Sequence, residues 1–317
     1  MRTNRIIIIT TCTGRKKISK YPPIHASNLP MGEQCDVLFS WKKLLIAQEW
    51  CTAARDVYCG RGFFEILKTT SSKDEDLFVI SAGLGLIHHK REIPSYNLTI
   101  SPSSPDSIQS RIIPGRPFDV SLWWSNLNKE LHNTCTPLAD LIRENSDSWV
   151  IISLSRPYAE MVLKDLSSLE VKYRKRLRIL GLTQPSIDFE PLQEFCMPYD
   201  ERFDGPDSVL PGTRSDFPQR VTSHFVENIL NPTEENATTA DHSRKVSDFL
   251  KGKRAPILVK REQNTDEQIR QIILRRWSDA RDSSAVMLRL LRDEEKIACE
   301  QKRFSQLFKA IKVVKNG

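Results

Sequence analysis

The chain has 317 residues, of which 39% are apolar and 27% charged, enough for a packed core and more than one domain. No apolar run approaches the roughly 20 residues of a membrane span, and the start, MRTNRIIIITTC, lacks a signal pattern, so we expect a cytoplasmic protein without membrane contact. The seven cysteines form no CxxC pair, which argues against a disulfide framework and against a zinc site.

The formal net charge of +7 is unevenly distributed. Residues 243–317 carry about 19 Lys and Arg against 10 Asp and Glu, whereas residues 1–242 carry about 28 against 30. A near-neutral body with a basic end is typical of a core that bears a nucleic-acid-binding appendage. We therefore expect DNA as a partner. The alternative is a solvated basic helical surface that binds nothing.

Short runs of β-branched and aromatic residues predict buried strands, and helical spacing fills the segments between them. The predicted strands are residues 5–11, 77–80, 149–155 and 177–180. The predicted helices are two in 36–68 around a glycine hinge, one over 123–143 and one that opens at Pro157. This alternation predicts an α/β fold, with a three-layer arrangement around a largely parallel sheet.

Three predicted strands end in small or polar residues, at Cys12, Ser81 and Ser155. In an open parallel sheet such ends lie along one edge, where ligands bind. Ser81 opens the turn SAGLGL, in which Gly83 and Gly85 would let a flat or phosphorylated group approach the backbone. On this interpretation Gly83→Val keeps the fold and blocks the ligand. The alternative is an ordinary turn, since the spacing is not a dinucleotide fingerprint.

Breaker-rich segments divide the rest of the chain. Residues 199–216 read as a loop, and a helix over about 219–230 closes a first domain, 1–232. The polar stretch 231–243 is a predicted linker to a second domain, 243–317.

The second domain is predicted to contain three short helices. Thr265 and Ser283 have the sequence context of N-caps, and the last helix, over 299–312, is rich in Lys and Arg. This pattern suggests a helix-turn-helix variant, with Lys302 and Arg303 as its DNA-binding candidates.

Cys12 is the candidate nucleophile. It follows a predicted buried strand and precedes Arg15 and Lys16, whose charges favour a thiolate. Asp200 is the candidate for moving protons. The alternative is a free buried cysteine without a catalytic role.

Cationic and aromatic side chains near these positions are candidates for contact with a base or phosphate. Arg55 and Tyr58, three residues apart, are predicted to clamp phosphate and stack on a base, although they also suit an ordinary surface charge and core aromatic. The predicted base- and phosphate-binding residues are Arg15, Lys16, Arg55, Tyr58, Ser81, Gly83, Gly85, Ser155, Tyr158, Arg202 and Arg214.

Two groups of polar residues also have ordinary explanations. Arg202 and Arg214 share a loop with Asp200 and Asp204, so they either bind a ligand or neutralise these acids. The adjacent histidines of residues 88–89 cannot readily face one metal ion, and no metal site is expected.

Several motifs together resemble the YaaA-like superfamily, over about residues 5–230: CTGRK, ARDVYCGRGF, VISAGLGLI, IPSYNLT, SLSRPYAEMVLKDL and YDERFDGPDSVLPGTRSDFPQR. The superfamily includes a peroxide-stress DNA-binding protein and a domain found beside archaeal tRNA-guanine transglycosylases. The tail ACEQKRFSQLFKAI is similar to the last helix of a narrower group, encoded in bacterial defence and DNA-modification islands. The peroxide-stress branch binds DNA through a helix-hairpin-helix, whereas this chain has a basic helical domain.

The resemblance implies an enzyme that converts the 7-cyano group of a deazaguanine base in DNA to a carboxamide. It implies no cofactor, and it implies other proteins of the same island as partners. Two alternatives remain at this stage: a non-catalytic DNA-binding protein of defence or stress protection, and a glycosylase-like enzyme that hydrolyses an N-glycosidic bond. Of the three, the nitrile conversion alone requires a thiol at Cys12.

Overall fold

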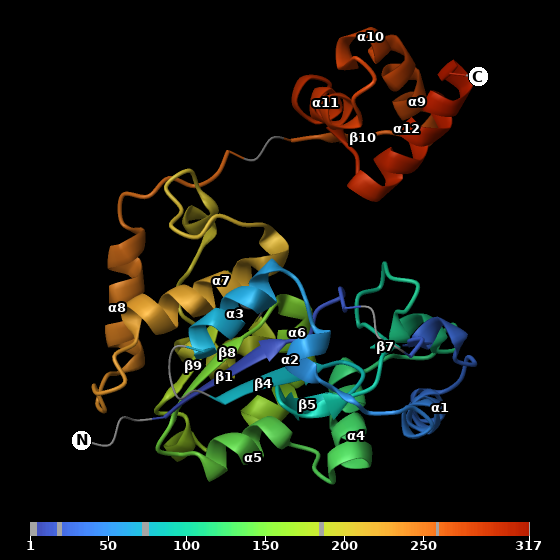
Figure 1. The fold of residues 1–317 in the computed structure, drawn as a ribbon. Helices are drawn as coiled ribbons and strands as arrows, with labels where there is room; N and C mark the ends of the chain where they lie inside the picture. Colours follow the sequence, from blue (N-terminus) through green and yellow to red (C-terminus); the bar gives the residue numbers. More distant parts are fainter. Residues whose placement is uncertain (1–4, 18–20, 72–75, 184–186, 258–259, 317) are drawn as a thin grey trace. The chain divides into compact units, whose positions relative to one another are not determined.

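The computed structural model describes residues 5–17, 21–71, 76–183, 187–257 and 260–316. The chain forms two compact units, Met1–Pro256 and Ile257–Gly317. Figure 1 shows both units as ribbons.

The first unit is built on a five-stranded sheet of order β5-β4-β1-β8-β9. Its strands are β1 (Ile6–Thr11), β4 (Asp76–Ser81), β5 (Gly85–His88), β8 (Trp149–Ser153) and β9 (Leu177–Leu180). β1, β4, β8 and β9 run parallel to one another, whereas β5 pairs antiparallel with β4. The predicted α/β fold with a largely parallel sheet is confirmed, and β1 is central as predicted.

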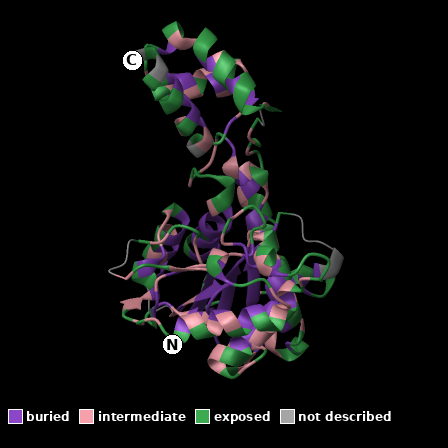
Figure 2. Cartoon of the chain, turned by 90° about the vertical axis from the view of Figure 1, so that its right-hand side faces the viewer, coloured by how far each residue is buried: buried purple, intermediate pink, exposed green. Residues whose placement is uncertain are grey.

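Helices cover both faces of this sheet, because alternate side chains of β1 enter two different apolar clusters. Ile7 and Ile9 pack with one group of helices, whereas Ile6 and Ile8 pack with the other. Figure 1 shows α3 and α7 over one face and α4 and α5 over the other. β1, β8 and β9 are buried along their whole length (Figure 2). The helices of the first cluster are α1 (Gln34–Ile46), α4 (Val120–His132), α5 (Pro137–Glu144) and α6 (Arg156–Ser167), and those of the second are α3 (Arg61–Ser71), α7 (Phe217–His224) and α8 (Thr239–Leu250).

Two helix predictions need correction. The predicted single helix over 123–143 is two helices, because Asn133 ends α4 in the left-handed conformation at φ 60° and Pro137 begins α5. The segment 36–68 holds a third, four-residue helix, α2, between α1 and α3. α2 covers Ala54–Val57, and the short strands of the unit are β2 (Ile24–His25), β3 (Thr52–Ala53), β6 (Glu92–Ile93) and β7 (Tyr96–Asn97).

The boundary between the units lies later than the sequence predicts. Thr238 caps α8 through a reciprocal capping box with Asp241, so a helix begins inside the predicted linker 231–243. Val246 and Leu250, one helical turn apart, are buried in the second cluster of the first unit. This apolar stripe fastens α8 to the first unit, and the compact second unit starts at Ile257. The helix predicted near 219–230 is α7, continued by a π-helical turn over Phe225–Ile229.

The second unit contains a small helical core. Thr265 and Ser283 cap α9 and α11 as predicted. Ile269, Ile273 and Phe304 are buried in its apolar cluster. Instead of three helices the described residues form four, because the four-residue α10 follows α9. The elements are β10 (Glu262–Gln263), α9 (Asp266–Arg275), α10 (Trp277–Ala280), α11 (Ser284–Arg289), β11 (Ile297–Ala298) and α12 (Gln301–Asn316), with a π-helical turn at Leu290–Glu294.

Within the described part of the chain, no helix has the length and apolarity needed to cross a membrane.

Candidate active site at the carboxyl ends of the strands

The carboxyl ends of β4, β1 and β8 meet at one edge of the sheet, because the three strands are parallel neighbours. Cys12 follows β1, and its backbone N–H donates to the carbonyl of Ile80 in β4 at 2.9 Å. Ser81 ends β4, and Ser155 is the N-cap of α6, two residues after β8. The sequence-predicted strand ends therefore come together along this edge.

Cys12 and Tyr158 form the central contact of the site. The Cys12 Sγ lies 3.1 Å from the Tyr158 hydroxyl oxygen, a hydrogen-bond distance for sulfur. Pro157 in the first turn of α6 starts the helix that carries Tyr158 to the strand end. Burial, and then the charge of Cys12, raise the pKa of the Tyr158 phenol well above its usual value. Tyr158 therefore keeps its proton at neutral pH and can donate it.

Lys16 supplies positive charge beside this pair. Its Nζ donates to the carbonyl of Thr13 at 3.3 Å and lies 4.5 Å from the centre of the Tyr96 ring. Burial lowers the pKa of Lys16, while the charges of Cys12, Asp106 and Cys59 act in the opposite direction. A lysine with a lowered pKa exchanges its proton more readily near neutral pH than an ordinary lysine does.

Three buried hydroxyls, those of Ser81, Tyr96 and Tyr58, form a chain beneath Lys16. The Ser81 Oγ lies 2.6 Å from the Tyr96 hydroxyl, which lies 2.7 Å from that of Tyr58. The Ser81 Oγ also accepts the backbone N–H groups of Gly83 and Leu84, so its own proton points to Tyr96. Burial raises the pKa of both tyrosines, which keeps this chain of hydroxyls neutral.

The predicted clamp of Arg55 and Tyr58 does not form. α2 ends at Val57, and Tyr58 continues in an extended conformation that buries its ring completely. Arg55 remains exposed, with its Nε 3.7 Å from the Asp56 carboxylate. The two side chains thus lie in different environments, and Tyr58 is a core aromatic rather than a base-stacking platform.

Gly83 and Gly85 make space for the protein's own side chains. The SAGLGL turn joins β4 to β5 as a hairpin, with Ser81 opposite Gly85. A Cβ added at Gly83 would lie 2.8 Å from a ring carbon of Tyr96 and 3.2 Å from one of Trp41. Gly85 has φ +75° and lies against Asn128. The expectation that Gly83→Val keeps the fold is wrong, because the position is filled by packing.

Asp200 is engaged away from the thiol. Its carboxylate accepts the Arg202 guanidinium at 2.7 to 3.0 Å. Although burial opposes the change, the hydrogen bonds from Arg202 lower the pKa of Asp200. Among the described residues, no hydrogen bond or ion pair joins Asp200 to Cys12. The contacts of Arg202 agree with its neutralising role. Asp204 pairs instead with Arg220 at 2.5 Å, and Arg214 is exposed.

The remaining predicted residues are more peripheral. Arg15 is exposed, and its backbone carbonyl accepts the hydroxyl of Thr13 at 2.6 Å and the N–H of Cys59 at 3.2 Å. In the second unit, Arg303 contacts Asp266 at 2.6 Å. The side chain of Lys302 lies outside the described residues.

Sequence reasoning did not assign Tyr96, or the buried hydroxyls of Thr10 and Ser153, to the site. Thr10 and Ser153 lie at or beside the ends of β1 and β8, and neither hydroxyl has a hydrogen-bond partner among the described residues. Such groups often mark a functional polar surface. The signal for all three was local: a hydroxyl at a strand end, or within the segment IPSYNLT.

Two histidines in the same unit do not form a metal site. His88 lies 3.8 Å from the Asp76 carboxylate, and the rings of His88 and His89 are 4.7 Å apart. In the described ranges, no three His, Cys, Asp or Glu side chains are grouped so that they could hold a metal ion.

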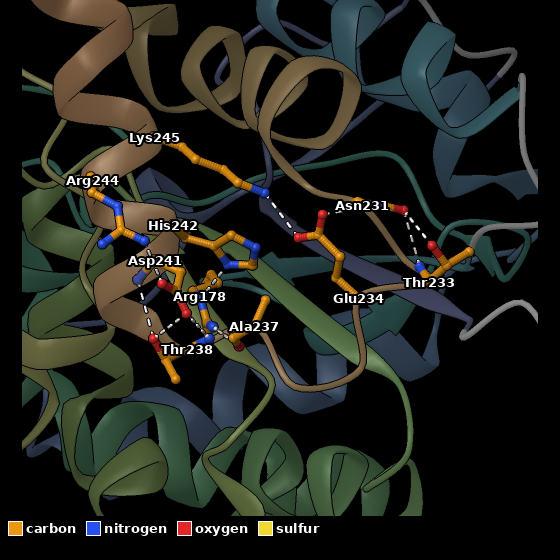
Figure 3. Close-up of polar contacts among 10 residues, drawn as sticks. All are labelled: Arg178, Asn231, Thr233, Glu234, Ala237, Thr238, Asp241, His242, Arg244 and Lys245. Atoms are coloured by element: carbon orange, nitrogen blue, oxygen red, sulfur yellow. Dashed lines mark hydrogen bonds and ion pairs between the residues drawn. The ribbon is translucent and has the colours of Figure 1, made fainter.

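Figure 3 shows a second polar cluster of the first unit, which lies beside the second apolar cluster. The Arg178 guanidinium donates to the Nδ1 of His242 at 2.9 Å and to the carbonyl of Ala237 at 3.0 Å. A neighbouring cavity of about 610 Å³ is lined by residues that include the ion-paired Glu234 and Lys245. Arg178 lies in the first half of β9 and stacks on Trp149, the first residue of β8. The cluster is therefore away from the carboxyl ends of the strands, where ligands bind in open α/β sheets.

Comparison with family models, with curated proteins and with solved structures finds no match for this chain.

Proposed function

We propose that this chain is a YaaA-like enzyme of a bacterial DNA-modification and restriction system, and that it hydrates the 7-cyano group of a deazaguanine base in DNA to a carboxamide. The observation that carries the chemistry is the thiol of Cys12, which lies 3.1 Å from the Tyr158 hydroxyl at the carboxyl ends of the parallel strands. Ligands of open α/β sheets bind at such ends. The substrate class and the role in antiviral defence rest on the resemblance of the motifs. The narrower group that the tail resembles is that of the DpdC-type proteins, which belong to 7-deazaguanine modification clusters.

The first half of the reaction is addition of the thiol to the nitrile. The Cys12 thiol passes its proton to an uncharged Lys16 as its sulfur forms a bond to the nitrile carbon, and one π bond of the nitrile becomes a lone pair on nitrogen. Tyr158 or Lys16 then gives that nitrogen a proton. The product is a thioimidate. In the net step one proton moves from sulfur to nitrogen, and no group leaves.

Water completes the reaction. It adds to the thioimidate carbon, and the resulting tetrahedral adduct breaks its carbon–sulfur bond. Oxygen and nitrogen stay on the carbon as a carboxamide, and the thiol of Cys12 is restored. The sum is nitrile plus water, so the proposed reaction needs no oxidant, reductant or cofactor.

The second unit is proposed to supply affinity for DNA, in the manner of a helix-turn-helix. Residues 257–317 contain 14 Lys and Arg against 9 Asp and Glu, and thus hold most of the net charge of +7. A base in a duplex must leave the stack to reach a strand-end site, at a cost of a few kcal/mol. Phosphate contacts made by a basic unit offset that cost.

The test is nucleoside mass spectrometry of cyano-deazaguanine DNA treated with purified protein. Cys12→Ser supplies a hydroxyl that is hardly ionised at neutral pH, so amide formation should fall by several orders of magnitude. Cys35→Ser, at an exposed cysteine of α1, is the matched control and should keep the wild-type rate. Amide formation at an undiminished rate by Cys12→Ser would exclude the thiol mechanism. A wild-type protein that binds the DNA and forms no amide, even with the proteins of its island, would favour the non-catalytic alternative.

A further inference from the structure

The second unit contains a cavity of about 750 Å³ with three arginines in its wall: Arg261, Arg292 and Arg303. The cavity lies where the paired strands β10 and β11 end beside the start of α12. Guanidinium groups that converge on one cavity suit phosphate, because each can donate two hydrogen bonds to its oxygens.

Backbone carbonyls hold all three arginines in place. Arg292 donates through Nε and Nη2 to the carbonyl of Cys299, at 3.3 and 2.9 Å. Arg261 donates to the carbonyl of Arg292 at 2.9 Å, and Arg303 to that of Asn264 at 2.8 Å. The side chains are therefore already ordered before a ligand arrives, which lowers the entropic cost of binding.

The carboxylates that pair with two of these arginines are easily replaced. Arg261 contacts Asp293 at 3.3 Å, and Arg303 contacts Asp266 at 2.6 Å. The side chains of Asp293 and Asp266 are 59% and 55% exposed, and exposed ion pairs of this kind contribute little. Among the described residues, no carboxylate pairs with Arg292. Its charge is available to an incoming anion.

Glu300 shows that the site accommodates an oxyanion. It lines the cavity directly before α12, and its Oε2 accepts the backbone N–H of Arg303 at 3.4 Å. A carboxylate oxygen at this position uses an N–H of the first helical turn, which also suits a phosphate oxygen. Glu300 therefore competes with a phosphate for this place.

We infer that this arginine-lined cavity binds a phosphate group of the DNA backbone, with Arg292 as its principal ligand and Glu300 as an internal competitor. The choice of DNA rests on the proposed function, whereas the phosphate chemistry rests on the cavity itself. The site gives the second unit one fixed phosphate contact in addition to diffuse positive charge. It positions the duplex and does not read the base sequence.

The experiment measures binding of a short fluorescent DNA duplex to the full chain over a series of salt concentrations. All proteins carry Cys12→Ser, so that turnover does not change the DNA. Arg292→Gln should weaken binding about 10-fold and lower the slope of log affinity against log salt by about 1. Arg289→Gln removes the same charge at an exposed position of α11 outside the cavity, and it should have a clearly smaller effect.

Glu300→Gln should change the DNA affinity in the opposite direction and strengthen binding severalfold, because the competing charge is removed. Thermal unfolding verifies that each variant is folded. If the Arg292→Gln protein is not folded, Arg261→Gln is used instead, with the same expected result. Equal losses in Arg289→Gln and in the cavity variants, or unchanged affinity of Glu300→Gln, would overturn the inference. The readout is binding alone, so a failure here is distinct from a failure of amide formation.

Discussion

Two polar clusters of the first unit differ in what surrounds them. Cys12, Lys16 and Tyr158 lie at the carboxyl ends of the strands and are partly exposed. Arg178 and His242 are completely buried beside the second apolar cluster (Figure 3). The first cluster can meet a ligand, whereas the second cannot without unfolding.

The two clusters also differ in how their polar atoms are satisfied. Arg178 donates to His242 and to three backbone carbonyls, including that of Leu177 at 2.6 Å. Four hydrogen bonds give the buried Arg178 charge a structural role. The Nε2 of His242 has no hydrogen-bond partner among the described residues. Cys12 has a hydroxyl and a cation as neighbours, and its sulfur remains free to react. Location at the strand ends and incomplete burial, rather than unusual charge alone, therefore distinguish the candidate active site.

The largest expected effect is on the reaction rate, from a substitution in the cluster that contains Cys12. Tyr158→Phe removes the proton donor next to Cys12 and should slow amide formation by about 10²- to 10⁴-fold. The ring is retained, so the midpoint of thermal unfolding should stay close to that of the wild type. Tyr173→Phe, at a partly exposed tyrosine outside the site, is the control. A Tyr158→Phe protein with the wild-type rate would remove Tyr158 from the mechanism.

The second cluster should respond through stability and pH. Burial and the charges of Arg178 and Lys245 lower the pKa of His242 to about 4, against the opposite influence of Glu234 and Asp241. The unfolded imidazole binds its proton below its ordinary pKa of about 6.5, whereas the folded one does not until about pH 4. The contribution of His242 to the free energy of unfolding is therefore fully present above pH 6.5. It is lost as the pH falls from 6.5 to about 4, by up to about 3 kcal/mol.

His242→Asn tests this account, because an amide cannot take up that proton. Urea denaturation between pH 7 and pH 4 should show a smaller loss of unfolding free energy for the variant than for the wild type. His89 and His224, whose pKa values burial also lowers to about 4, remain in both proteins and cancel in the difference. Parallel curves would show that His242 is not responsible. The rate of amide formation at pH 7 should be the same in both proteins.

The sequence predicts the sheet and the edge of the site well, because both depend on local patterns. Continuous β-branched runs identify the buried parallel strands, and the residue that follows each run lies at the carboxyl edge by topology. Cys12, Ser81 and Ser155 could be placed on one edge from this alone, whereas the contact between Cys12 and Tyr158 was not predicted. The helix caps at Thr265 and Ser283 were equally readable, since capping is a matter of a few adjacent residues.

The errors concern contacts between residues distant in the chain. Nothing adjacent to Gly83 indicates that Tyr96 and Trp41 will fill the space beside it. Tyr58 was expected on a helix surface, but its hydroxyl bonds to that of Tyr96 in the core. The segment around Val246 was predicted to belong to the second domain, because it follows the polar stretch 231–243 and begins the basic part of the chain. Charge does not reveal that an apolar stripe binds the helix to the first unit.

The central claim is that the Cys12 thiol attacks a nitrile, and the covalent adduct is its most direct measure. Protein and cyano-deazaguanine DNA are mixed, quenched with acid and digested, and the peptides are mapped by mass spectrometry. The account predicts that the peptide containing Cys12 gains the whole mass of the nitrile nucleotide, because addition expels no group. Cys12→Ala should show no such peptide, while Cys35→Ala should retain it. The account would be contradicted if Cys12→Ala formed the carboxamide at the wild-type rate and the wild-type protein showed no adduct on Cys12.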